Sequence, residues 1–196
     1  MCKFSSDMKA KLGNTIAYIV SNVSNPSKTK ILKILYLMEE EMVRRHGVPF
    51  LCLPFEVWKM GPVQKDVFVD LSDGGTMLED YVEQEYRDGS MVFKSKVAFD
   101  EDEFSDAELS MMKDIVSLYG KKSAAQLVAY LHKKESLWYK TAAENGLIDD
   151  FKKGLRNNSP FCIDFRSLIS GKQVEGYNDS VDIHSAANSM KALAHV

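Results

Sequence analysis

Two neighbouring stretches of the sequence decide the fold. They are Lys33-Ile34-Leu35-Tyr36-Leu37-Met38-Glu39 and Phe55-Glu56-Val57-Trp58-Lys59-Met60-Gly61-Pro62-Val63. The first lies in a run whose apolar residues recur every three or four positions, which is typical of an amphipathic helix. Its charged residues are expected to face away from the core: Glu39, Glu40, Arg44 and Arg45. The second stretch is typical of a short edge strand that breaks at Gly-Pro.

Helices are predicted on both sides of this strand. Ser27 is an N-cap candidate for the helix just described, and Gly47 suits its C-terminal end because glycine takes positive φ at low cost. An earlier helix is expected between Ser5 and Asn25-Pro26, so these two helices should pack as a hairpin. After the strand, Pro62 suits the first turn of another helix, where its missing N–H has no intrahelical partner to lose.

The clearest β signal lies between residues 81 and 97. Asp88-Gly89 at its centre is typical of a two-residue type I′ turn, which needs positive φ at both positions. That turn and the alternation of apolar and polar residues predict one hairpin register. It pairs Tyr86 with Met91, Gln84 with Phe93, and Glu83 with Lys94.

Two capping boxes predict the start of two further helices. Ser105 with Glu108 begins the first, and Ser123 with Gln126 begins the second, since each pair can satisfy the other's backbone N–H groups. A following helical segment contains Trp138 and stops near residues 145–146.

The pattern loosens in the C-terminal quarter of the chain. Residues 171–180 read as a loop, and the Ala-rich stretch 181–196 has only a thin apolar stripe. The predicted fold class is therefore mainly α with a small antiparallel β-hairpin, an α+β arrangement. We expect a helical domain over residues 1–146 and a C-terminal extension over residues 147–196, packed on the domain or binding a partner.

The composition indicates a soluble cytoplasmic protein. Of its 196 residues 45% are hydrophobic and 27% are charged, and the net charge is −3. That balance provides no general attraction to nucleic acid, whose binders usually carry a basic surplus. The three cysteines are widely spaced and odd in number, which favours a reducing compartment. No apolar run approaches the roughly 18 residues of a membrane span, so no membrane partner is expected.

No motif for catalysis, a cofactor or a metal is visible. The sequence has neither a G-x-S-x-G elbow nor a phosphate-binding G-x-x-x-x-G-K-[ST] loop. His132 with Glu135 has a helical spacing but completes no metal motif. His132 is expected instead to act as a cation at the end of the Ser123 helix, where the helix dipole favours positive charge.

Residues 105–134 also resemble a helix-turn-helix, with the preceding hairpin as a wing. Its predicted DNA-binding residues are Lys121, Lys122, Gln126, Lys133 and Lys134. Gln126 could read adenine, and the lysines could contact phosphates. The helix between the lysines carries no Arg or Lys of its own, however, so core packing is the simpler interpretation. A DNA-binding regulator is therefore the alternative function.

From Ile16 to Gly146 the chain resembles the Panacea-domain, SocA-like, phage-associated antitoxin family. The resemblance lies in the order and spacing of several short elements. These elements are Lys33–Leu37, Gly47 with Pro49, Trp58 with Gly61-Pro62-Val63, Phe104–Leu109, Tyr119-Gly120, Ser123-Ala124, Leu127 and Trp138-Tyr139.

The resemblance implies an antitoxin of a toxin–antitoxin system that neutralises a cognate protein toxin by direct binding, without an enzymatic site. Operator DNA is a second partner to consider, because such antitoxins often regulate their own operon. The shared residues have structural interpretations in this chain: Tyr36, Trp58, Gly61, Pro62, Val63 and Trp138. Recognition is then expected in the variable part, residues 147–196 or the N-terminal helix. The pattern specifies neither the toxin nor an oligomeric state.

Overall fold

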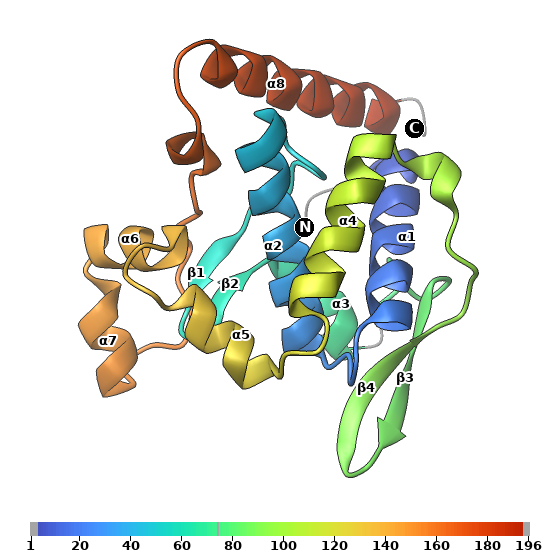
Figure 1. Ribbon diagram of the computed structural model, residues 1–196, viewed down its shortest axis with the longest axis horizontal. Coiled ribbons are helices and arrows are strands. Elements are labelled where there is room, and N and C mark those ends of the chain that lie inside the picture. The colour runs from blue at the N-terminus through green and yellow to red at the C-terminus, as the bar shows by residue number, and fades with distance from the viewer. Residues whose placement is uncertain (1–3, 74, 194–196) are drawn as a thin grey trace.

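A computed structural model describes residues 4–73 and 75–193 of the chain, and their fold is mainly α with two small antiparallel sheets (Figure 1). The first half contains α1 (Ser6–Asn22), α2 (Lys28–His46), β1 (Glu56–Trp58), β2 (Gly61–Val63), α3 (Lys65–Asp73), β3 (Val82–Arg87) and β4 (Ser90–Ser95). The second half contains η1 (Glu101–Glu103), α4 (Asp106–Tyr119), α5 (Ala124–Leu131), α6 (Leu137–Glu144), α7 (Leu147–Lys153), η2 (Phe165–Leu168) and α8 (Lys172–Leu193).

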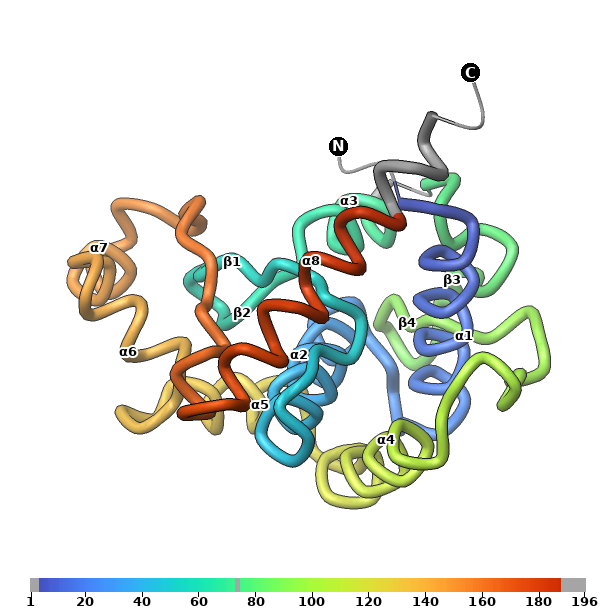
Figure 2. The backbone as a smooth tube through the Cα atoms, turned by 90° about the horizontal axis from the view of Figure 1, so that it is seen from above, coloured from blue at the N-terminus to red at the C-terminus, as the bar shows by residue number. Residues whose placement is uncertain are grey.

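Helix α2 is the centre of the fold. It begins at the predicted cap, where the Ser27 hydroxyl accepts from the N–H of Lys30, and ends at Gly47 with φ of 70°. It packs against α1, α3, α4 and α5, and Figure 2 shows it surrounded by other elements. A helix covered on all sides buries residues of every face. The prediction that Glu39 faces away is therefore wrong, because its side chain lies in the interior with 1% exposed.

The β1–β2 sheet corrects two sequence predictions. Pro62 and Val63 belong to strand β2, and α3 begins only at Lys65, so Pro62 does not open a helix. Strand β1 is also not an edge strand. It pairs with β2 on one side, and on the other its Val57 N–H donates to the carbonyl oxygen of Phe161 over 2.8 Å. A segment a hundred residues away therefore completes this sheet.

The β3–β4 hairpin confirms the predicted register. Tyr86 pairs with Met91 and Gln84 with Phe93, while the turn residues Asp88 and Gly89 have φ of 50° and 77°. The base of the hairpin packs against α1, whereas its tip extends beyond the body of the molecule (Figure 1). Tyr86 is consequently 72% exposed and Met91 48% exposed.

Both predicted capping boxes are confirmed at the starts of α4 and α5. The loop predicted for residues 171–180 is wrong, because α8 begins at Lys172 and continues to Leu193. This helix crosses the end of the bundle formed by α1, α2 and α4 (Figures 1 and 2). Its inner side chains are only half-buried: Val174, Tyr177, Val181 and His184.

Candidate functional site

The aromatic residues of the two deciding stretches meet in the interior, between α2, the β1–β2 sheet and α6. Tyr36 is fully buried, Trp138 is 3% exposed and Trp58 is half-buried. The indole N–H of Trp138 donates to the backbone oxygen of Trp58 over 2.9 Å. Tyr36 packs edge-on against Phe55 with ring centroids 5.3 Å apart. Tyr36 and Phe55 therefore contact each other inside the domain, Trp138 is bound to the backbone of Trp58, and the buried Tyr36 and Trp138 present little surface to a partner.

Lys33 joins α2 to the Gly-Pro turn. Its ammonium group donates to the carbonyl oxygen of Pro62 over 2.7 Å, and its side chain is fully enclosed. Gly61 has φ of 96°, and a Cβ at that position would lie 3.0 Å from Lys33 Cε. Glycine is thus required both by the backbone conformation and by the lysine. Burial lowers the pKa of Lys33 to about 7.

His132 lies beside this lysine at the end of α5. Its ring stacks on Trp138 with centroids 3.9 Å apart and an interplanar angle of 7°. Burial, and secondarily the charge of Lys33, lowers the pKa of His132 to about 4. The prediction that His132 acts as a helix-end cation is therefore wrong, since at neutral pH its imidazole is uncharged. Its Nε2 atom and the Tyr36 hydroxyl are buried without a hydrogen bond among the described residues.

Glu39 organises the loop that follows α2. One carboxylate oxygen accepts from the Phe50 N–H over 3.1 Å and the other from the Leu51 N–H over 2.9 Å. Burial raises the pKa of Glu39 to about 7, although these backbone hydrogen bonds act in the opposite direction. The carboxyl group thus satisfies two backbone donors that would otherwise be buried without a partner.

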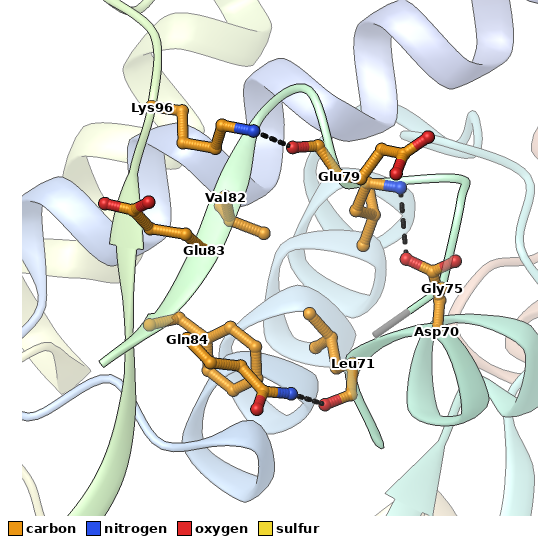
Figure 3. Close-up of a pocket in the computed structure, with 10 residues that line it drawn as sticks. Asp70, Leu71, Gly75, Glu79, Val82, Glu83, Gln84 and Lys96 are labelled. Atoms are coloured by element: carbon orange, nitrogen blue, oxygen red, sulfur yellow. Dashed lines mark hydrogen bonds between the residues drawn. The ribbon is translucent and has the colours of Figure 1, made fainter. Parts of the chain in front are cut away.

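Shifted pKa values of this kind mark candidate acids and bases. Lys33 and Glu39, however, lie in the packed interior, and His132 is half-buried against Trp138. A surface pocket of about 360 Å³ opens elsewhere, between α3 and the β3–β4 hairpin, and none of these three residues lines it (Figure 3). Across the described part of the chain, no group of three or more His, Cys, Asp or Glu residues is placed to hold a metal ion. The arrangement around Lys33 is therefore suited to holding elements together.

The predicted DNA-binding residues surround α5. Lys121, Gln126, Lys133 and Lys134 are exposed and Lys122 is half-buried. The side-chain oxygen of Gln126 accepts from the Ser123 N–H over 2.8 Å, so the capping box uses the acceptor that would read adenine. Figures 1 and 2 place the hairpin against α1, on the opposite side of α2 from α5. It does not lie beside α5 as a wing would.

Sequence reasoning missed Lys33 and Glu39 as interior groups and missed the pocket. One available signal was the run from Ile31 to Met38, in which Lys33 is the single charged residue. A helix that is apolar on all sides is a buried helix, and its charged residue must find a partner inside. The pocket has no such local signal, because the residues that line it come from α3, the following loop and both strands of the hairpin.

Fold and site define a helical domain built on an interior aromatic and polar network. The family model described as the antitoxin SocA-like, Panacea domain matches residues 31–139. This match covers more than half of the chain, and the chain belongs to that family. The matched range includes both deciding stretches, the pocket and α5. Searches of curated proteins and of solved structures gave no match.

Proposed function

We propose that this protein is a cytoplasmic, non-enzymatic antitoxin that neutralises a separately encoded protein toxin by direct binding. The observation that carries this proposal is the family match over residues 31–139. The burial of Tyr36 and Trp138 supports it, because the shared aromatic residues then serve the scaffold and leave recognition to the surface. None of the helices in the described residues is long and apolar enough to cross a membrane.

Co-expression with the adjacent gene tests this proposal. The neighbouring gene should arrest growth when expressed alone and should be tolerated together with this protein. The two purified proteins should also form a complex. A neighbour that is harmless when expressed alone, or a pair that does not associate, would contradict the antitoxin function.

Within the C-terminal extension, we propose that residues 147–168 complete the domain and that α8 contributes to toxin capture. Two observations support this division. Phe151 and Phe165 are 4% exposed, and the Ile163 N–H donates to the Phe55 carbonyl oxygen over 2.9 Å. Helix α8 is different, because its inner side is half-buried and Ile183 on its outer side is 69% exposed.

Truncation from Gly176 onward is expected to weaken toxin binding by about tenfold while the domain stays folded. The loss of stability should be limited to about 1–2 kcal/mol, because Tyr177 and Val181 bury only part of their surface. Calorimetric titration with the toxin and urea unfolding of the truncated protein measure the two effects. Unfolding of the truncated protein would show that α8 belongs to the core.

A DNA-binding regulator is the second candidate, favoured by the exposed Lys121, Lys133 and Lys134 at the ends of α5. If the protein binds its own promoter, the affinity is expected to fall steeply with salt, because phosphate contacts release counterions. A gel-shift series at increasing salt measures this. The absence of a shift at low salt would exclude this candidate.

A further inference from the structure

The pocket between α3 and the β3–β4 hairpin has an apolar floor and a polar rim (Figure 3). Leu71, Val82 and Phe93, which line the pocket and are buried, form the floor. At one end of the pocket the amine of Lys96 donates to the backbone oxygen of Glu79, and at the other end the Gln84 amide donates to the backbone oxygen of Leu71 over 3.1 Å. Tertiary hydrogen bonds therefore fix the walls.

Two carboxylates on the rim remain available to a ligand. The Asp70 carboxylate is already used, because it accepts from the N–H groups of Met77 and Leu78 over 2.9 and 3.0 Å. The Glu79 side chain, by contrast, is exposed and makes no hydrogen bond or ion pair with any described residue. The Glu83 side chain is about half exposed and meets only the exposed amine of Lys94, at 3.8 Å. Glu83 alternates with Val82 and Gln84 along β3, and Figure 3 shows its carboxylate and that of Glu79 on opposite sides of the pocket, with the Lys96 amine between them. An incoming cation could therefore approach Glu79 or Glu83, but not both at once.

The same face of the hairpin continues from the pocket to an exposed apolar tip. Gln84 pairs with Phe93 and Tyr86 pairs with Met91, so these four side chains lie on one face, since residues two apart on a strand point the same way. The pair at the base lines the pocket, while the pair at the tip is exposed. An exposed aromatic residue and a methionine beside a pocket are typical of a protein-binding surface.

The charge distribution indicates what this surface would attract. Residues 66–106 contain thirteen Asp and Glu residues and only three Lys and Arg residues, a formal charge of −10 within a chain whose total is −3. The remainder of the chain therefore carries a surplus of positive charge. Such a one-sided field speeds the approach of a basic partner and repels nucleic acid and anionic membranes.

We propose that this face, defined by the pocket together with Tyr86 and Met91, is a docking site for a basic segment of the partner protein. Arg or Lys side chains of that segment pair separately with Glu79 and with Glu83 at opposite edges of the pocket, and one of them places its aliphatic stem on Leu71, Val82 and Phe93. Apolar residues of the same segment cover the hairpin tip. This inference rests on the proposed function, in that the partner is the toxin, and it adds a contact separate from α8.

The test compares two double variants of the full-length protein in calorimetric titrations with the purified product of the adjacent gene. Glu79→Gln with Glu83→Gln removes two charges at the pocket and should raise Kd about tenfold, because each exposed ion pair changes affinity by a few-fold. Glu101→Gln with Asp102→Gln removes two exposed charges from the same acidic segment outside the pocket, and should change Kd less than about twofold. Tyr86→Ser should weaken binding independently of salt.

Each outcome decides between this inference and the proposed function. If the wild-type protein binds the toxin and both double variants bind equally well, the docking site is refuted while the antitoxin function stands. If the wild-type protein does not bind, both fall. Binding of free L-arginine without any effect of the pocket variant on the toxin would assign the pocket to a small cation. Self-association lost in that variant alone, by sedimentation, would assign it to a second copy of the chain; either result overturns the proposal.

Discussion

Replacing Glu39 by alanine is expected to lower the free energy of unfolding by about 3 kcal/mol. The change leaves the N–H groups of Phe50 and Leu51 without their carboxylate acceptor in the interior, where each unpaired donor costs about 1–3 kcal/mol. It also leaves a cavity, because Glu39 is only 1% exposed. Relief of the buried carboxylate, whose pKa is raised by burial, offsets part of this loss. Urea unfolding at pH 8, where Glu39 is ionised in both states, measures the net effect.

Two further variants test whether the loss of stability in Glu39→Ala comes from the lost hydrogen bonds. Glu39→Gln keeps the volume but offers one acceptor in place of two, so about half of the loss is expected. Glu41→Ala removes a half-exposed carboxylate from the same helix, where its partners are Arg44 and Arg45, and should cost less than about 1 kcal/mol. Equal losses for Glu39→Ala and Glu41→Ala would mean that the buried contacts with Phe50 and Leu51 do not stabilise the fold.

The parts of the fold that were predictable depend on local chemistry. The hairpin register follows from Asp88-Gly89, because two positive φ angles in a two-residue turn leave only one pairing of the flanking strands. The starts of α4 and α5 follow from capping boxes that each span four residues. In each case the residues that determine the structure are neighbours in the sequence, so no knowledge of the tertiary fold was needed.

The errors arose where distant segments determine the structure. Pro62 satisfies the rules for a helix start. In the structure it pairs instead with Val57 of β1, and Lys33 donates a hydrogen bond to its carbonyl oxygen. Helix α8 has almost no apolar periodicity, because it covers the bundle end with a half-buried stripe, so residues 171–180 resembled a loop. Glu39 looked like a solvated residue because the segments that cover α2 come from other parts of the chain.

The interior network and the surface pocket differ in the same way in how far the sequence could predict them. The interior network could be located approximately from sequence, since Tyr36, Trp58, Gly61 and Trp138 were identified by their family pattern. The pocket could not, because its floor joins α3 to a hairpin through the Gln84–Leu71 hydrogen bond. The pKa shifts of Lys33, Glu39 and His132 could not be predicted from the sequence either, because desolvation depends on tertiary packing.

Stability is expected to rise with pH between 7 and 10 because of Lys33. Burial lowers the pKa of Lys33 to about 7 in the folded protein, from an ordinary value of 10.5. Between these values the unfolded chain binds more protons than the folded one, so removing protons favours folding. At about 1.4 kcal/mol per pH unit, the gain from pH 7 to pH 10 is about 4 kcal/mol. Below pH 7 the folded lysine is charged as well, and its contribution becomes constant.

The range from pH 7 to 10 is used because Glu39 and His132 change stability in opposite directions at lower pH. Glu39, with its pKa raised to about 7, makes stability fall as the pH rises from 4.5 to 7. His132, with its pKa lowered to about 4, makes stability rise between pH 4 and 6.5. Their effects largely cancel where they overlap. Above about pH 8 neither group changes its charge in the folded or the unfolded state, and between pH 7 and 8 only the last part of the Glu39 ionisation remains, which leaves Lys33 as the dominant one of the three.

The measurement is a difference between two pH profiles obtained by urea unfolding at pH 7, 8, 9 and 10. Lys33→Met removes the titration, so the wild-type profile should rise by about 4 kcal/mol relative to this variant. Lys113→Met, at an exposed position of α4, should run parallel to the wild type. Parallel profiles for the wild type and Lys33→Met would mean that water reaches the lysine. The link between α2 and the Gly-Pro turn, common to both deciding stretches, would then not be the dry contact that the structure places there.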